Sequence, residues 1–269
     1  MEWQKFTPSA QLQKIVECYW VYEEPGTVGP QVYSVLPSPK PSIIVVLGNQ
    51  NQAVAFESAH GERVLEGWML GQVTDRRLTL RCTPPANLFG VMFQPTGFYQ
   101  LFGVSILLAA GMGPEQACAP REFGRALTRR VRAAESHAER VAAAEELLLA
   151  EPGHHTFGAP VVEVVGAALR QRRGQVYADE LARLAHLSRR QLERRFREAV
   201  GVSPKLFAEI SRFDRVFQLL KEQPQTSWHD LAQACGYFDQ AHFIREFRRF
   251  TEETPAAFFQ QGRDADPLF

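Results

Sequence analysis

The sequence predicts an α+β protein with a β-rich, barrel-like N-terminal domain and an all-α C-terminal domain, in which a long helix joins two helix-turn-helix units. Three observations support this fold class. Short apolar segments alternate with Pro and Gly up to about residue 104, strong helix formers dominate from Arg121 onward, and the last third of the chain contains an internal repeat. We place the boundary near residue 155, so that residues 1–155 and 156–269 form the two domains.

Short apolar segments of the N-terminal half are expected to be β-strands, because turn residues such as Pro84-Pro85 separate them. Several short strands with turn signals between them are typical of a sandwich or a barrel. The predicted strands are Cys18–Tyr22, Gln31–Leu36, Ser42–Leu47, Ala53–Phe56, Leu78–Leu80 and Leu88–Phe93.

Helix-forming residues take over in the middle of the chain. The segment Arg129–Ala150 is rich in Ala, Glu, Arg and Leu and contains neither Gly nor Pro, so we expect a helix there. Its apolar positions make no clean heptad, which favours packing within the chain over pairing with a second copy. Glu151-Pro152-Gly153 ends this segment, residues 154–160 read as a linker, and a new helix is expected over Val161–Arg172.

Charge is distributed unevenly along a chain whose 30 basic residues balance its 30 acidic ones. The segment Arg170–Phe250 carries a net charge of +6, whereas Met1–Leu169 carries −3 and the residues from Thr251 onward carry −3. A basic block inside an otherwise acidic chain suits a polyanionic partner, although charge alone does not identify one.

Neither a membrane protein nor a secreted protein is indicated. The four cysteines are scattered too widely for a zinc site, and no signal-peptide pattern precedes them. No run of 18 apolar residues occurs, so no membrane span is expected. We therefore expect a cytoplasmic protein with reduced cysteines.

No metal, cofactor or enzymatic centre is expected. Of seven histidines only His60 lies in residues 1–120, which is too few for a His-rich metal cluster, and His154-His155 is interpreted as a surface pair. No nucleophile–base pair, paired carboxylates or phosphate-binding loop stands out. Gly111-Met112-Gly113 lacks the strand and helix context of a dinucleotide loop.

The internal repeat covers most of the C-terminal third. Leu181-Ala182 aligns with Leu231-Ala232, and His186 then stands against Gly236. One inserted residue in the second turn brings Ser188 against Asp239, and from there the offset is constant at 51. The pairs that follow are Leu192 with Phe243, Arg194 with Arg245, Phe196 with Phe247, Arg197 with Arg248, Ser203-Pro204 with Thr254-Pro255, and Phe207 with Phe258.

Each copy is predicted to form a short helix, a turn and a second helix. In the first copy, Ala178–Ala185 is the short helix, and Ser188 with Gln191 forms a capping-box pattern for the second. Leu192, Phe196 and Val200 recur at helical spacing and give it a buried stripe, and Gly201 stands where a left-handed stop is needed.

The second copy and the connecting helix show the same kinds of signal. Ser227 is expected to cap a helix over Trp228–Cys235, and Asp239 is expected to cap the next one. Between the copies, Ser203 and Pro204 begin a long amphipathic helix that ends before Pro224.

The predicted exposed faces of the two second helices carry side chains of the kinds that read or hold DNA. A helix-turn-helix unit lays its second helix in the major groove, where Arg pairs with guanine, Glu with cytosine and Gln with adenine, and apolar groups touch thymine methyls. An Arg-rich face on a lone helix is most often a solvated face, but two matched copies in a basic block favour DNA. The candidate residues are Arg189, Arg190, Glu193, Arg194 and Arg197 in the first unit and Gln240, His242, Ile244 and Arg245 in the second.

The segment Ala178–Phe259 resembles the DNA-binding domain of the AraC/XylS family. The resemblance rests on Leu181-Ala182, Leu187-Ser188, Leu192, Arg194 to Arg197, Gly201, Ser203-Pro204, Ala234-Cys235-Gly236-Tyr237, Asp239-Gln240-Ala241-His242-Phe243, Phe247-Arg248 and Thr254-Pro255. It implies double-stranded DNA as the partner. The second helix of each unit, the recognition helix, would enter one of two successive major grooves on the same face of the DNA.

The resemblance also implies roles for single residues. Base-reading positions fall on Arg190, Glu193, Arg194, Gln240, Ala241, His242 and Arg245, to which the residue pattern adds Arg189. Backbone contacts are expected from Ser188, Arg197 and Arg248, although the two arginines could instead hold neighbouring acids.

Three residues depart from the family pattern. Tyr177 stands where a capping Ser or Thr is expected, so the first helix would begin loosely. Glu252 replaces the usual Gly after the second unit, so that helix would end differently. Ala241 offers no hydrogen bond, so the second unit would read fewer bases than the first.

A second resemblance rests on the segments Glu17-Cys18-Tyr19-Trp20, Leu36-Pro37 to Leu47, and Val91-Met92-Phe93-Gln94-Pro95 to Leu101-Phe102-Gly103. With these segments, residues 1 to about 150 resemble the N-terminal effector or dimerisation domain of the same family, a small cupin-like barrel. The aromatic side chains that could line a ligand pocket or simply fill the barrel, which is the interpretation we favour, are Tyr19, Trp20, Tyr22, Trp68, Phe89 and Phe93. No ligand residue is assigned, and a monomer and a homodimer remain open, as does contact with RNA polymerase.

Three functions follow as alternatives. The first is a sequence-specific transcription regulator tuned by a small molecule or a protein partner. The second is an architectural or nonspecific DNA binder, and the third is an enzyme-like barrel fused to a DNA-binding module. A large ratio of specific to nonspecific affinity distinguishes the first from the second.

Overall fold

The computed structural model describes residues 2–23, 31–48, 54–58, 61–65, 68–71, 74, 78–82, 87–106, 119–151, 160–171 and 178–260. His154, His155 and Tyr177 lie outside these residues, as does His60, and the Trp68 side chain lies outside the described side chains. Of the helices that the structure describes, none is long and apolar enough to span a membrane.

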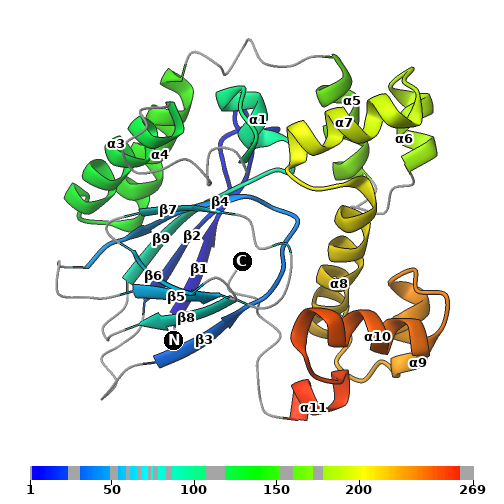
Figure 1. The fold of residues 1–269 in the computed structure, drawn as a ribbon. Coiled ribbons are helices and arrows are strands. Elements are labelled where there is room, and N and C mark those ends of the chain that lie inside the picture. Colours follow the sequence, from blue (N-terminus) through cyan, green and yellow to red (C-terminus); the bar gives the residue numbers. More distant parts are fainter. Residues whose placement is uncertain are drawn as a thin grey trace.

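The N-terminal half consists of two antiparallel sheets (Figure 1). The first sheet has the order β1 (Glu2–Phe6), β2 (Val16–Glu23), β9 (Asn87–Phe93), β4 (Ser42–Val46) and β7 (Trp68–Gly71). The second has the order β3 (Gln31–Val35), β8 (Leu78–Cys82), β5 (Val54–Ser58) and β6 (Gly61–Leu65).

All six predicted strands are present, and the structure adds β1, β6 and β7. The sequences of β1 (EWQKF) and β6 (GERVL) contain too many charged residues to stand out as apolar segments. Both strands lie at the edge of a sheet, where polar side chains are tolerated. Within the described residues each sheet ends on open edges, so the expected closed barrel is not seen and the coarser α+β prediction is the one confirmed.

The large aromatic side chains of the two central strands fill the N-terminal core. Tyr19, Phe89 and Phe93 are fully buried in one apolar cluster, and Trp20 is fully buried and stacks on Trp3 with ring centroids 4.8 Å apart. Gly90 is the register partner of Trp20, and a Cβ atom there would lie 1.9 Å from the indole ring. These aromatics therefore pack the core, as favoured above.

The prediction of one continuous helix over Arg129–Ala150 is wrong, because two helices cover this segment. The chain forms α3 (Ala119–Ala133) and α4 (His137–Ala150), and Ser136 begins the second helix by accepting a hydrogen bond from the Glu139 N–H at 3.2 Å. The break contains no Gly or Pro, so helix propensity did not reveal it. Both helices bury apolar side chains in the N-terminal core.

The remaining helices are α1 (Gly97–Phe102), α5 (Pro160–Gln171), α6 (Ala178–Leu184), α7 (Arg189–Val200), α8 (Pro204–Glu222), α9 (Trp228–Ala234), α10 (Gln240–Thr251) and α11 (Pro255–Gln260). Figure 1 shows α3 and α4 on one side of the sheets and α5 to α11 on the other, with α8 upright between the α5–α7 group and the α9–α11 group.

The predicted helix caps are confirmed. Ser188 and Gln191 form a capping box on α7, with both the side-chain and the backbone hydrogen bonds present. Ser203 caps α8, whose first residue is Pro204. Ser227 caps α9 and Asp239 caps α10 through the N–H groups three residues on.

Each unit contains two residues in the left-handed region. His186 (φ 52°) and Gly201 (φ 88°) hold these places in the first unit, and Gly236 (φ 82°) and Glu252 (φ 65°) hold them in the second. The expectation that α10 ends differently is therefore wrong, because Glu252 takes the same left-handed stop as Gly201 and donates its N–H to the Arg248 carbonyl at 2.8 Å. The second unit makes this stop with a residue that has a Cβ atom.

We expect glycine at either non-glycine position to stabilise the fold. His186→Gly and Glu252→Gly should each raise the free energy of unfolding by about 0.5–1 kcal/mol, since relief of the left-handed strain exceeds the added freedom of the unfolded chain. Gly201→Ala should lower it by about 1 kcal/mol. Urea unfolding measures all three, and a lower midpoint for both glycine variants would contradict this account.

Candidate nucleic-acid interface

The two helix-turn-helix units share one helix as their support. The first unit packs α5, α6 and α7 around the start of α8, where Phe196 meets Phe207 edge to face with centroids 5.6 Å apart. The second unit packs α9, α10 and α11 around the rest of α8, where the ring centroids of Phe213 and Phe247 lie 5.4 Å apart. The spacing between α7 and α10 is therefore set by one continuous helix.

The predicted DNA-contacting residues of α7 lie on its solvent face. Leu192 and Phe196 are buried on the opposite side, as the stripe predicted. The exposed residues of this face are Arg189, Arg190, Glu193, Arg194 and Arg197. On α10 the predicted residues Gln240, Ala241, Arg245 and Arg248 are exposed, as is Arg249, opposite the buried Phe243 and Phe247.

Ion pairing divides the arginines of these two helices into two groups. Arg195 pairs with Glu198 at 3.5 Å, and Arg249 pairs with Glu209 at 2.8 Å. Arg189 makes long pairs with Asp179 at 3.8 Å and Glu193 at 3.5 Å, so these groups partly satisfy one another. In the part of the chain that the structure describes, no acidic partner is found for Arg190, Arg194, Arg197, Arg245 and Arg248.

All five arginines without an acidic partner are ones that the sequence analysis predicts to contact DNA. A guanidinium with no carboxylate partner keeps its donors for a phosphate or a guanine edge. Arg197 and Arg248 do not hold neighbouring acids in the described residues, which removes the alternative given for them above.

His242 is partly engaged within its own unit. Its Nδ1 accepts a hydrogen bond from the Phe238 N–H at 3.4 Å, and its ring meets Tyr237 edge to face with centroids 5.4 Å apart. Its Nε2 lies 3.6 Å from a carboxylate oxygen of Glu246. Base reading by His242 requires the ring to give up some of these contacts.

Ile244 does not lie on the exposed face. It is partly buried and packs against the apolar core of the second unit, which leaves less of its side chain for the predicted contact with a thymine methyl. Ser188 remains exposed, and its hydroxyl can donate to a phosphate oxygen while accepting the Gln191 N–H.

A buried ion pair joins α10 to α8. Arg212 donates to Glu246 at 2.9 Å, and the Glu246 side chain is only 6% exposed. The Arg212 guanidinium also lies over the Tyr237 ring, 5.4 Å from its centroid. This pair and the aromatic core fix how α10 is rotated about its axis.

Sequence reasoning missed Phe238, the residue that is inserted in the second turn. The Leu187 N–H donates to the Ala182 carbonyl and the Tyr237 N–H donates to the Ala232 carbonyl, both at 2.9 Å, so Leu187 and Tyr237 are equivalent. The extra residue before the Asp239 cap is therefore Phe238, and it is 90% exposed. The repeat alignment pointed to an insertion but not to its exposure.

We expect Glu246→Gln to lower the free energy of unfolding by about 3 kcal/mol, because Arg212 then stays buried without a counter-charge. Glu146→Gln is the matched control, since Glu146 pairs with Arg130 at 2.6 Å on the surface and should change stability by less than about 1 kcal/mol. Urea unfolding of both variants decides the matter, and equal losses would show that burial of the Arg212 pair is unimportant.

Comparison with known families matches two parts of the chain. Residues 181–261 match the model described as "Helix-turn-helix domain". Residues 4–109 match a domain of unknown function, DUF6597. The two matches fall on the two halves of the chain described above.

Curated relatives match about a third of the chain. The chain is 33% identical over 84 residues to the HTH-type transcriptional regulator MtrA of Neisseria gonorrhoeae, covering 31% of this chain and 28% of that protein. It is 36% identical over 90 residues to GbdR of Pseudomonas aeruginosa (34% and 23%) and 33% identical over 90 residues to the activator RhaS of Escherichia coli (34% and 32%). The match thus spans about a quarter to a third of each relative.

Solved structures show a looser likeness. The DNA-binding domain of AdpA in complex with a target DNA has 31% identity and a TM-score of 0.35, covering 42% of this chain and all of that one. ToxT of Vibrio cholerae has 10% identity and a TM-score of 0.48, covering 90% of this chain and 96% of that one.

Proposed function

We propose that the whole chain is a sequence-specific regulator of transcription of the AraC/XylS type. The match of residues 181–261 to a helix-turn-helix domain and the identity to HTH-type regulators support this proposal. The named relatives are regulators of transcription and not enzymes, which favours this function over a catalytic barrel.

One observation carries the proposal. The exposed faces of α7 and α10 hold arginines without acidic partners in the described residues, and both helices pack on the same α8. A nonspecific polyanion binder needs only positive charge. A fixed pair of helices with Glu, Gln and unpaired Arg near their N-termini also has the groups that read base edges.

The residue roles follow from position and chemistry. Base reading is assigned to Arg189, Arg190, Glu193 and Arg194 in the first unit and to Gln240, Ala241, His242 and Arg245 in the second. Ala241 contributes shape without a hydrogen bond. Ser188, Arg197 and Arg248 are assigned to the DNA backbone, where they set register without reading sequence.

Phe238 adds an apolar contact that the first unit lacks. It stands at the N-terminus of α10, the end that faces the base edges in a helix-turn-helix complex. An aromatic ring that is 90% exposed in the free protein is explained if it packs against a thymine methyl or a deoxyribose in the complex.

The N-terminal half is proposed to be the effector or dimerisation domain, with a cupin-like barrel arrangement of its two sheets and a boundary near residue 155. RNA polymerase is a further proposed partner, and the site of action is the cytoplasm of a bacterial cell. Monomer and homodimer are both compatible with these roles.

Selection of bound sequences from a random duplex pool at a stated salt concentration tests the function. Because α8 holds the two recognition helices apart, we expect two short boxes about one helical turn, roughly 10 bp, apart. An architectural binder would instead enrich no sequence and would bind all duplexes with similar affinity. A single box would mean that only one unit engages the groove.

Replacing one unpaired arginine should relax base preference. We expect Arg194→Ala to weaken binding to the selected duplex by about 1–3 kcal/mol and to lose discrimination at one base position. Arg195→Ala is the matched control on the same helix, since Arg195 pairs with Glu198, and it should leave base preference unchanged. Competition binding against single-base variants of the duplex measures both, and unchanged selectivity of Arg194→Ala would refute the assignment.

Removal of the Phe238 ring should weaken DNA binding without affecting the fold. Phe238→Ala should lose about 1 kcal/mol of affinity, because roughly 40 Å² of apolar contact would be missing. The loss should be the same at low and high salt, unlike the loss on Arg248→Ala, which should also reduce the salt dependence. Affinity equal to that of the unmodified protein would remove Phe238 from the interface.

A further inference from the structure

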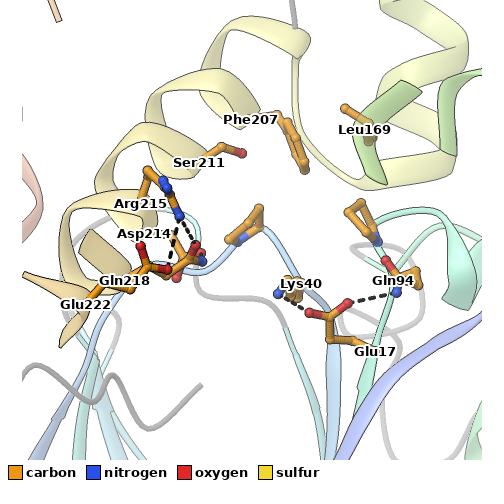
Figure 2. A pocket seen from close by; sticks show the side chains of 12 residues that line it. Glu17, Lys40, Gln94, Leu169, Phe207, Ser211, Asp214, Arg215, Gln218 and Glu222 are labelled. Carbon is orange, nitrogen blue, oxygen red and sulfur yellow. Dashed lines mark hydrogen bonds and ion pairs between the residues drawn. The ribbon is translucent and has the colours of Figure 1, made fainter. Parts of the chain in front are cut away.

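A cavity of about 400 Å³ lies between the N-terminal half and α8 (Figure 2). One wall comes from the N-terminal half, with Glu17 on β2, Lys40 in the loop before β4, and Gln94 after β9. The other wall comes from α8 and the C-terminal part of α5. The volume falls in the range of sites that hold small organic ligands.

The polar groups of the N-terminal wall satisfy one another. Lys40 Nζ lies 2.6 Å from Glu17 Oε1, and Gln94 Nε2 donates to Glu17 Oε2 at 2.8 Å. Figure 2 shows these three side chains joined at the bottom of the cavity. The ammonium and the carboxylate of this wall are thus already paired.

The wall on α8 keeps one carboxylate without a cation of its own. Arg215 bonds Gln218 at 3.2 Å and pairs with Glu222 at 3.8 Å. Asp214 accepts only the neutral amide of Gln218, at 2.7 Å, among the hydrogen bonds that the described residues make to it. Burial raises the pKa of Asp214, and the positive charge of Lys40 across the cavity opposes that rise.

Ser211 is the second unsatisfied group on this wall. Its side chain is 94% buried, and its hydroxyl has no hydrogen-bond partner in the described residues. It stands one turn before Asp214 on α8, so the two side chains share a face of the helix. Figure 2 shows Ser211 on the α8 wall of the cavity, between Asp214 and Phe207. A buried hydroxyl without a partner is costly, and a ligand group that reaches this oxygen would remove that cost.

The rest of the lining is apolar or uncharged. Leu169 and Phe207 stand at one end of the cavity, and Pro39 and Pro95 face them from the N-terminal half. The three carboxylates of the lining outnumber its two cations by one. A ligand with one positive charge and an apolar body would match both features.

We propose that this cavity is an effector site for a small organic amine, whose ammonium group binds Asp214 and Ser211 and whose apolar body lies between Phe207 and the two prolines. This inference rests on the proposed function, because it names the effector class of the regulator. An anionic ligand is disfavoured, since it would have to take Lys40 from Glu17 and face the unpaired Asp214.

The cavity is placed where occupancy alters the DNA-binding helices. Two further contacts join the N-terminal half to the helices. Leu36 is buried in the core of the second unit. The Tyr99 hydroxyl of α1 donates to Glu198 on α7 at 3.1 Å. A ligand that changes the gap between the β-rich half and α8 therefore changes the contacts that hold α7 and α10, which shifts the populations of the DNA-binding arrangement.

Thermal unfolding of the full chain tests binding, with 2-phenylethylamine as the probe and 2-phenylethanol and 3-phenylpropionate as neutral and anionic controls. We expect a saturable rise in melting temperature with the amine alone. Asp214→Asn should weaken the apparent affinity about tenfold or more, because the charged partner is lost. Glu146→Gln, which removes the same charge from the surface of α4, should bind as the unmodified chain does.

Three results would overturn the site: no shift with the amine up to about 10 mM, a shift that Asp214→Asn preserves in full, or a shift produced by the carboxylate instead. The melting temperature of Asp214→Asn without probe shows whether the variant is folded. If it is not, Ser211→Ala serves as the second variant and should also weaken amine binding.

The effect on DNA is measured separately, with the selected duplex. The amine should change the duplex affinity several-fold, and the duplex should change the amine affinity by the same factor. Amine binding without any effect on the duplex would overturn the regulatory role and leave the proposed function intact. Amine binding by a chain that selects no duplex would overturn the proposed function and leave the amine site intact.

Discussion

The apolar stripe of α8 is the constraint on which the rest of the C-terminal half depends. Phe207 belongs to the core of the first unit, whereas Ile210, Phe213 and Phe217 belong to the core of the second. Because these side chains occur on one uninterrupted helix, the two units cannot rotate independently without losing packed aromatic contacts. The polar side of the same helix forms a wall of the cavity, so the proposed ligand site and the proposed recognition helices share a single rigid element.

Ion pairing on this half of the molecule is selective. Carboxylates hold arginines where a helix must be fixed to its neighbour, as Glu246 holds Arg212 and Glu209 holds Arg249. On the faces turned away from these contacts, arginines keep their donors for another molecule. The overall charge of the chain is zero, so the proposed surface for DNA depends on this local arrangement and not on an excess of positive charge.

The sequence predicted those parts of the structure that are decided within a few residues. Caps such as Ser188 and Asp239 and the buried stripes of α7 and α10 are local patterns, and the repeat shows them twice. The break between α3 and α4 was missed although Ser136 and Glu139 mark it within four residues, because the strong helix formers on both sides favoured one continuous helix. The edge strands β1 and β6 were missed because their charged residues hide the strand pattern. The cavity joins Lys40 to α8 across most of the chain length, so no window of sequence contains it.

The covering of Leu36 by the second unit has a consequence for dissection of the protein. Leu36 is 3% exposed and belongs to the same apolar cluster as side chains of α8 to α11, and the Tyr99 ring packs against the core of the first unit. A fragment made only of the helical half would present to water the apolar surface that these side chains now cover. Such a fragment would therefore differ from the full chain in stability as well as in regulation. Its DNA affinity would combine the release of the N-terminal contacts with partial loosening of the units themselves.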